Sequence, residues 1–342
     1  MSPRNHILAL ARGSLIFVCL AAMATPSAQP AAPQQSPAEQ HPPPMRPGVH
    51  TPGVSRPLSS IQTQAVFPVE GNPDWSVVTK AAVWVTSGRT NHVVQLVIAT
   101  NKPGLVVEVP EPCSGIANGF GAIWSPSCRD KAVLRIDPAT GKVIASVAAE
   151  PANSEGGIAV GAGLVWIVTK PSTLVGISPQ TNAVTVRIPL PAGSENPIYD
   201  GGFLWVSSYQ NGALLKVDPV SHSVVATIAV GPKPRFLTSG AGSVWTLNQG
   251  DGTISRVDQA SGRLVATIPA GIPGPGGEIT FGYGFVWATM FKYPVTQVDP
   301  KTNTVVKQWA GDGGDGIRFG AGSIWLSNGR QGNVWRFSPN QK

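Results

Sequence analysis

Four acidic side chains have the types and spacing to form a cation site. A carboxylate recurs roughly 40 residues apart at two places in the chain. These carboxylates are Glu155 and Glu195, and then Glu278 and Asp315. Hard divalent cations prefer oxygen ligands, so the candidate cofactors are Mg²⁺ and Ca²⁺. The alternative interpretation is that all four are solvated loop carboxylates that hold no cofactor.

An arginine and three aromatic side chains are the candidate ligand-binding residues. They are Arg235, Trp75, Tyr209 and Tyr293. A guanidinium group can grip an anion through two parallel hydrogen bonds, and aromatic rings can stack on a sugar-like ligand. The alternative is that the rings only pack between neighbouring loops.

Other sequence features predict structure rather than chemistry. No Ser/His/Asp or Cys/His arrangement indicates nucleophilic catalysis. Repeated Gly-x-Gly pairs such as Gly240 and Gly242 lie between strand-like runs, whereas a dinucleotide fingerprint opens a helix, so we interpret them as hairpins. Cys113 and Cys128 are the cysteines that follow the N-terminal segment, and we expect them to form one structural disulfide.

The elements that must position these side chains come from a repeat. A motif that reads Gly-x-Gly-x-[Ile/Val]-Trp in its most regular copies recurs every 38–42 residues. Its tryptophans are Trp84, Trp124, Trp166, Trp205, Trp245, Trp287 and Trp325. Each repeat reads as four short strands with no helix between them. This pattern predicts an all-β fold, a seven-bladed β-propeller of four-stranded antiparallel blades, with the indoles filling the gaps between blades.

A propeller would gather the candidate residues on one side of the ring. The loop before the first strand of each blade and the loop joining its second and third strands emerge on the same face, which we call the loop face. The acidic and aromatic candidates fall in or beside these loops, around the mouth of the central channel. Blade order places Glu155 beside Glu195 and Glu278 beside Asp315, with Arg235 between the two pairs.

The two ends of the chain predict how the ring closes. The last repeat stops after a third strand near residue 337, and residues 60–68 read like a fourth strand that has no repeat of its own. We therefore expect residues 60–68 to complete the last blade, which would hide two open sheet edges.

The N-terminus predicts export. Arg4 and Arg12 precede a short apolar run that is followed by small residues, which is typical of a signal peptide over residues 1–28. Residues 29–58 are rich in Pro, Ala and Gln and predict a disordered linker, and residues 59–342 form the propeller. The expected location is periplasmic or secreted, with no membrane span in the mature chain.

Charge excludes one class of partner. The net charge is +7, but the basic residues are scattered along the chain and form no stripe, so we expect no nucleic-acid binding. We expect a monomer whose partner is a small molecule or an envelope protein.

The repeat resembles a known superfamily. The motif around each tryptophan is followed by [Ile/Val]-Asp-Pro-x-[Thr/Ser]-[Gly/Asn]-x-Val, most regular at residues 136–143. This combination resembles the streptogramin B lyase-like (virginiamycin B lyase-like) and YVTN-type seven-bladed propellers over residues 59–339. Quinoprotein propellers carry a tryptophan near the end of each outer strand, a place that only Trp309 has here, so we expect a different family.

The resemblance predicts the fold more firmly than the activity. It implies a histidine base and a glutamate-bound magnesium ion on the loop face. Only His92 falls in a joining loop, and the residues around it do not match a family motif. We therefore expect a propeller that binds a small ligand or protein on its loop face without catalysis. The alternative is a metal-dependent lyase or hydrolase of this superfamily.

Overall fold

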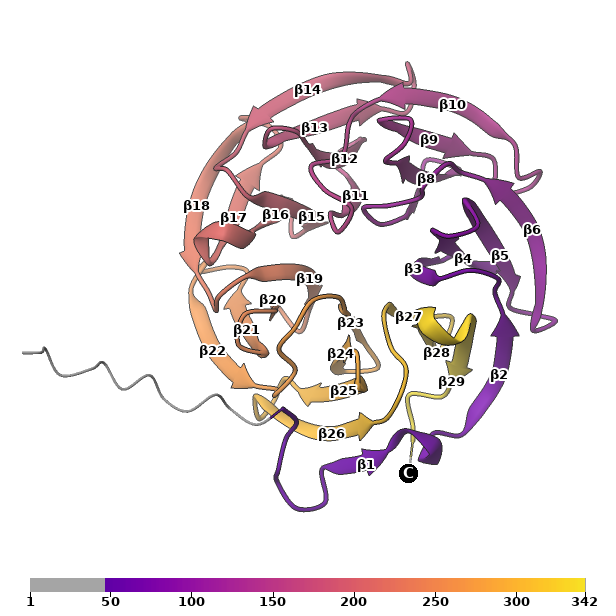
Figure 1. Ribbon diagram of the computed structural model, residues 1–342. Helices are drawn as coiled ribbons and strands as arrows, with labels where there is room; N and C mark the ends of the chain where they lie inside the picture. Colours follow the sequence, from indigo (N-terminus) through magenta and orange to yellow (C-terminus); the bar gives the residue numbers. More distant parts are fainter. Residues whose placement is uncertain (1–46, 342) are drawn as a thin grey trace, which may run out of the picture. The chain divides into compact units, whose positions relative to one another are not determined.

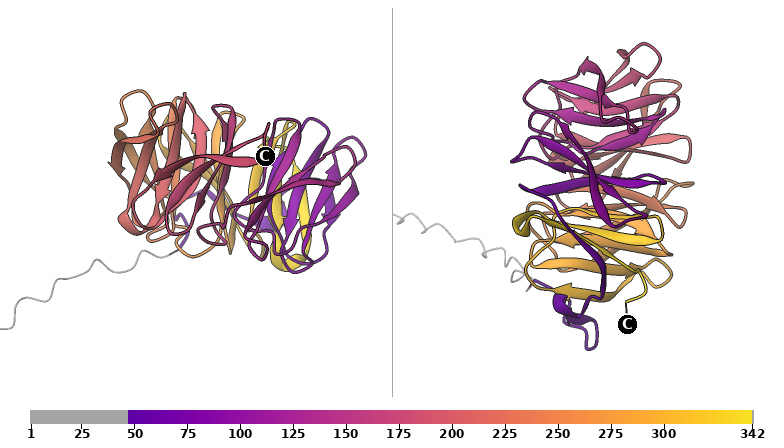
Figure 2. Two further views of the ribbon diagram at one scale, coloured as in Figure 1. Left: turned by 90° about the horizontal axis from the view of Figure 1, so that it is seen from above. Right: turned by 90° about the vertical axis from the view of Figure 1, so that its right-hand side faces the viewer.

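The computed structural model describes residues 47–341, and they form a ring of seven β-sheets (Figure 1). The expected propeller is confirmed: each sheet is a blade of four antiparallel strands, and the blades stand side by side in one ring (Figure 2). The signal peptide and most of the linker, residues 1–46, lie outside the described residues.

The blades follow each other in chain order. Blades 1 to 3 are β3 (Pro73–Val78), β4 (Ala82–Ser87), β5 (His92–Val97) and β6 (Lys102–Glu108); β7 (Ala117–Gly119), β8 (Ala122–Ser127), β9 (Ala132–Ile136) and β10 (Val143–Ala148); and β11 (Ile158–Gly161), β12 (Leu164–Thr169), β13 (Thr173–Ser178) and β14 (Ala183–Pro189). Blades 4 and 5 are β15 (Ser194–Asp200), β16 (Phe203–Ser208), β17 (Ala213–Asp218) and β18 (Ser223–Ala229); and β19 (Pro234–Gly240), β20 (Ser243–Asn248), β21 (Thr253–Asp258) and β22 (Leu264–Pro269).

The last two blades include strands from the N-terminal side. Blade 6 is β23 (Glu278–Gly282), β24 (Phe285–Met290), β25 (Tyr293–Asp299) and β26 (Thr304–Ala310), with β1 (Ser55–Pro57) added; blade 7 is β27 (Ile317–Gly320), β28 (Ser323–Asn328), β29 (Asn333–Phe337) and β2 (Thr63–Pro68). The helical elements of residues 47–341 are the short 3-10 turns η1 (Leu58–Ser60), η2 (Tyr209–Asn211) and η3 (Gly329–Gln331). Within the same residues, no helix is long and apolar enough to cross a membrane.

The ring closes as the sequence predicts. Strand β2 pairs antiparallel with β29, so the N-terminal strand is the fourth strand of the last blade. Phe67 on β2 is fully buried, and its ring lies 5.7 Å from that of Trp325 on β28. Closure therefore contributes core packing as well as backbone hydrogen bonds.

The predicted boundary between linker and propeller is wrong for residues 47–58. Strand β1 pairs parallel with β26 and adds a fifth strand to the rim of blade 6 (Figure 1). The buried amide of Gln308 fixes this segment: its Oε1 accepts a hydrogen bond from Val49 N–H at 2.8 Å, and its Nε2 donates to Ala270 O at 2.9 Å. Composition alone missed the segment because its hydrogen bonds come from the backbone, and few apolar side chains mark it.

The seven repeat tryptophans hold neighbouring blades together. All of them lie on second strands and are at most 1% exposed. Each indole packs on the following blade; Trp166 of blade 3, for example, belongs to a core cluster with Leu204 and Val206 of blade 4. Its indole N–H also donates to Gly161 O, 2.9 Å away, in its own hairpin.

The glycines of the repeat have two different roles. In the turn between β19 and β20, Ala241 and Gly242 both have positive φ, at 52° and 68°, so only the second glycine of each pair serves the hairpin turn. Gly240 has no positive φ, and a Cβ there would collide with the ring of Phe281 in the next blade. The first glycine is therefore required for close contact between blades, which corrects our interpretation of both glycines as hairpin residues.

Four cationic side chains that the sequence showed only as scattered bases clamp adjacent blades. Arg135, Arg256 and Arg336 each lie on the third strand of a blade, opposite the repeat tryptophan of that blade. Their guanidinium groups lie 5.0–5.1 Å from the indole centroids. The same groups donate to the outer turn of the next blade: Arg256 Nη1 lies 2.6 Å from Pro300 O and 2.9 Å from Asn303 Oδ1. Lys216 has the same place in blade 4.

The expected disulfide is present. Cys113 and Cys128 form a disulfide, with their Cα atoms 6.0 Å apart. Cys113 precedes β7 and Cys128 follows β8, so the bond joins the two ends of this hairpin on the loop face. The backbone pairing of Cys113 N–H with Pro126 O, at 3.2 Å, brings the two cysteines into reach.

Replacing Phe67 tests the closure. We expect Phe67→Ala to lower the free energy of unfolding by about 3–5 kcal/mol, because it empties a buried site between the first and last parts of the chain. The matched variant is Val66→Ala on the same strand, where the side chain is 52% exposed and the expected loss is below about 1 kcal/mol. Urea unfolding followed by tryptophan fluorescence measures both; equal losses would contradict the closure.

Candidate functional site

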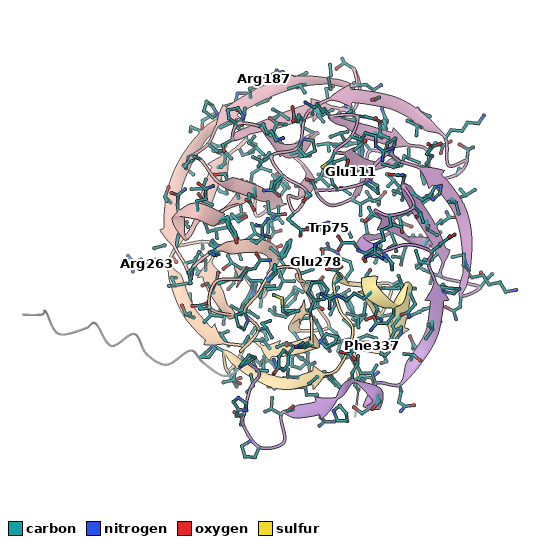
Figure 3. All side chains as sticks on the ribbon, viewed as in Figure 1. Trp75, Glu111, Arg187, Arg263, Glu278 and Phe337 are labelled. Atoms are coloured by element: carbon teal, nitrogen blue, oxygen red, sulfur yellow. A yellow bond between two sulfur atoms is a disulfide. The ribbon has the colours of Figure 1, made fainter. Side chains whose placement is uncertain are left out.

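Side chains from the innermost strands occupy part of the centre of the ring. The first strands of the blades lie innermost, and Trp75 on β3 and Glu278 on β23 lie near the central opening, whereas Arg187 and Arg263 lie on the outer rim (Figure 3). Trp75 is 7% exposed and meets Phe236 of blade 5 edge to face, with the ring centroids 5.4 Å apart. The cavity between them measures about 70 Å³. It is too small for an organic ligand, because ligand pockets typically need about 300 Å³ or more.

Arg235 and Tyr209 come together as predicted. The guanidinium group of Arg235 on β19 lies 4.2 Å from the centroid of the Tyr209 ring in η2. It forms an ion pair with Glu195 Oε2 at 2.8 Å, and its Nε donates to Gln249 Oε1 at 2.9 Å. Gln249 is a partner that the sequence analysis missed. The arginine is therefore held from three sides at the channel mouth.

Among residues 47–341, no ring stacking, ion pair or hydrogen bond joins the other two aromatic candidates to Arg235 or Tyr209. Trp75 packs inside the channel on Phe236, as described above. Tyr293 begins β25 and lies against the N-terminal segment, where a Cβ on Gly48 would come within 2.8 Å of its hydroxyl oxygen. For Tyr293 the structure favours the packing interpretation.

The first predicted acidic pair surrounds Arg235. Burial raises the pKa of Glu195, while Arg235 and a hydrogen bond from Asn153 act in the opposite direction and Glu155 raises it further. Burial also raises the pKa of Glu155, and Arg235 again opposes it. Glu155 and Glu195 are thus neighbours, as blade order predicts, and they share one guanidinium group.

The second predicted pair is divided. Glu278 is 3% exposed and forms an ion pair with Arg318 of blade 7, and its Oε2 accepts the Ile317 N–H at 2.8 Å. Arg318 Nε donates in turn to Ser76 O of blade 1 at 3.1 Å, and burial lowers the pKa of Arg318 to about 10. This arrangement joins three blades across the inner wall.

Asp315 instead faces carboxylates of other blades. Its pKa is raised to about 7, mainly by burial and also by the charge of Glu155, while Arg330 acts in the opposite direction. Burial also holds the pKa of Asp74 on β3 well above its ordinary value, with Asp315 and Glu155 adding to the effect. Asp74, Glu155 and Asp315 are therefore three interacting carboxylates from different blades, near enough to one another for their charges to shift the pKa values of Asp74 and Asp315. Asp74 was overlooked as a site residue, although closing the ring places blade 1 beside blade 7.

Comparisons with known proteins show which family the repeat belongs to. A sequence profile of the family described as outer membrane protein assembly factor BamB, a PQQ-type propeller family, matches residues 129–302, just over half of the 342-residue chain. The chain belongs to this family. Quinoprotein propellers are PQQ-type propellers. The match therefore overturns the expectation, based on Trp309, that the chain belongs to a family different from theirs. None of the curated proteins matches the sequence.

Solved structures confirm the resemblance to the lyase-like superfamily at the level of fold. A streptogramin B lyase is 18% identical, with a TM-score of 0.65 over 79% of this chain and 93% of the lyase. A catalytically inactive virginiamycin B lyase from Staphylococcus aureus, solved with quinupristin, is 16% identical, with a TM-score of 0.67 over 81% and 98%. The Pan2 WD40 domain of Neurospora crassa is 10% identical, with a TM-score of 0.63 over 80% and 90%. Identities this low show the shared fold alone.

The acidic side chains of this BamB-type propeller differ from the cation site that we considered. Glu195 and Glu278 each have a guanidinium partner, so these two of the four candidate ligands are already neutralised. Within residues 47–341, no group of three or more His, Cys, Asp or Glu side chains has the arrangement to hold a metal ion. The observed donor set therefore fits Mg²⁺ or Ca²⁺ poorly, and a bound cation stays a prediction.

The raised pKa of Asp315 predicts how stability depends on pH. The folded protein binds this proton more tightly than the unfolded chain, so the stabilisation is complete below about pH 4 and is lost as the pH rises through about 7. In Asp315→Asn, the fall in unfolding free energy between about pH 5 and about pH 8 should shrink by on the order of 1–2 kcal/mol, allowing for partial exposure.

Urea unfolding at the two pH values measures this change. Asp312→Asn, an exposed carboxylate in the same loop, is the control and should leave the pH dependence of the wild type. If Asp315→Asn kept the pH dependence of the wild type, Asp315 would not bind its proton more tightly in the folded protein than in the unfolded chain.

Proposed function

We propose that the protein is an exported, non-catalytic propeller that binds an envelope protein on its loop face, around the channel mouth. The observation that carries this proposal is the Arg235 arrangement. The Arg235 side chain is 12% exposed, is fixed by Glu195 and Gln249, and holds the half-buried ring of Tyr209 in place. Tyrosine and arginine side chains are enriched among the residues that dominate binding energy at protein interfaces.

Two further features support a protein partner over a small enclosed ligand. The channel cavity of about 70 Å³ is too small to enclose an organic ligand, which favours contacts on the rim around it. Membership of a family described as an outer membrane protein assembly factor supports a role in contacts with other envelope proteins. A small ligand held on the same rim is the other form of this proposal.

Site-specific photo-crosslinking tests the proposal. A photoreactive amino acid at Gln210, on the exposed loop-face side, should crosslink to a defined partner in cells, and the same group at Val220, which is 86% exposed on the opposite face, should not. Tyr209→Ala should reduce the yield at Gln210 about tenfold, because it removes the ring beneath Arg235.

Tyr283→Ala supplies the matched control. This tyrosine is 52% exposed in the hairpin between β23 and β24, on the face opposite the loops, so its loss should leave the crosslink unchanged. Equal yields from both faces, or equal effects of the two tyrosine variants, would refute loop-face binding.

A metal-dependent lyase or hydrolase is the second candidate. The observation that favours it is the electrostatic interaction of Asp74, Glu155 and Asp315, three carboxylates from different blades, although their arrangement in this structure is not that of a metal site. This candidate predicts about one equivalent of Mg²⁺ or Ca²⁺ in the purified protein, lost in Asp315→Asn, and turnover of a streptogramin B such as quinupristin. Elemental analysis without stoichiometric metal, together with no turnover, would leave the binding function alone.

A further inference from the structure

A hollow beside the channel mouth has a different chemistry from the mouth itself. It measures about 260 Å³ and lies between the loops of blades 6 and 7. One wall is Phe291 and Lys292, between β24 and β25; the other is residues 312–314 before β27 and Arg330 in η3. These segments all emerge on the loop face, and η3 is the short yellow turn after β28 in Figure 1.

Arg330 is the principal group in this hollow. Its guanidinium carbon lies 4.6 Å from the centroid of the Phe291 ring. The side chain is exposed, and no ion pair or hydrogen bond joins it to another side chain among residues 47–341. Stacking on a ring fixes the plane of a guanidinium group and leaves its N–H edges free, which is the geometry that takes a carboxylate through two parallel hydrogen bonds.

The neighbouring charges also favour an anion. Lys292 adds a second positive charge to the lining, against one carboxylate, Asp312. Asp315 lies outside this lining but near enough for the charge of Arg330 to act on it; burial keeps its pKa raised, at about 7, which reduces its negative charge near neutral pH. Gly313 also lines the hollow, and its N–H donates no hydrogen bond within the described residues.

We propose that this hollow is a carboxylate-binding subsite for the partner or ligand of the loop face. The proposal rests on the proposed function and names the chemistry of one contact. The carboxylate is supplied by a peptide C-terminus, by an acidic side chain or by a small free acid. Each of these presents the same planar pair of oxygens to Arg330.

The repeat provides a matched control for Arg330. Arg89 has the same place in blade 1, in the loop after the tryptophan-bearing strand, and it is also exposed. Among residues 47–341, no aromatic ring stacks with Arg89, and it lines none of the described hollows. The two arginines share charge and exposure, and they differ in the ring beneath them.

Titration of the isolated protein tests the subsite without needing the partner. Three probes distinguish the sources: an acetylated dipeptide with a free C-terminal carboxylate, a dipeptide amide with an acidic side chain, and sodium acetate. The uncharged amide of the first dipeptide is the negative probe. We expect at least one carboxylate probe to shift the backbone amide resonances of Gly313 and Gly314 in NMR spectra, with no shift from the uncharged amide.

Variants connect the signal to Arg330. Arg330→Gln should weaken the bound probe about tenfold, Phe291→Leu should weaken it several-fold while keeping the charge, and Arg89→Gln should leave it unchanged. Equal weakening by Arg330→Gln and Arg89→Gln, or no shift with any carboxylate, would overturn the subsite. Failure here with intact loop-face crosslinking would leave the proposed function standing; the reverse result would leave the subsite and remove the protein partner.

Discussion

The packing of each indole against the next blade is the interaction on which this structure depends. Every blade presents one tryptophan on its second strand, and its neighbour presents an apolar first or second strand to that ring. Apolar burial of this kind is non-directional, so the contact alone would leave the blades free to slide. The glycine that admits the neighbouring side chain and the cations that reach the neighbouring turn give it direction.

The same construction determines where function can lie. Because the blades meet closely, side chains such as Trp75 and Phe236 occupy part of the channel, and two arginine–glutamate pairs close its wall between blades. A buried charge must be paired to be tolerated, and these pairs satisfy each other across blade boundaries. Polar groups without such partners remain at the mouth and in the adjoining loops, where a rigid ring holds them at fixed positions.

Much of the fold could be predicted from the sequence, because its signals are local and repeated. Tryptophan spacing gave the number of blades, and an unmatched strand pattern at each end gave the closure. The cysteine pair followed from two residues that flank one hairpin. Residues 47–58 were misjudged, because parallel pairing of β1 with β26 depends on a partner more than 250 positions away along the chain.

The candidate site was harder to predict, because side chains choose partners by local geometry. Blade order placed Glu195 near Arg235 correctly, yet it placed Glu278 beside Asp315 and gave no indication that Arg318 would capture the glutamate. Tyr293 shares a loop with Phe291, and sequence could not say which ring faces the mouth and which faces the rim. Which of two nearby rings faces the mouth depends on a shift of one or two positions along the chain.

Ring closure has a consequence for how the protein is made. Strands β2 and β29 pair across almost the whole chain, and Gln62 and Gln341 bond backbone to side chain over a separation of 279 residues. The ribosome makes β2 early and must then add the strands of all seven blades up to β29 before the partner of β2 exists. The nascent molecule therefore carries an unpaired strand until β29 has been made, and the ring cannot close before that point.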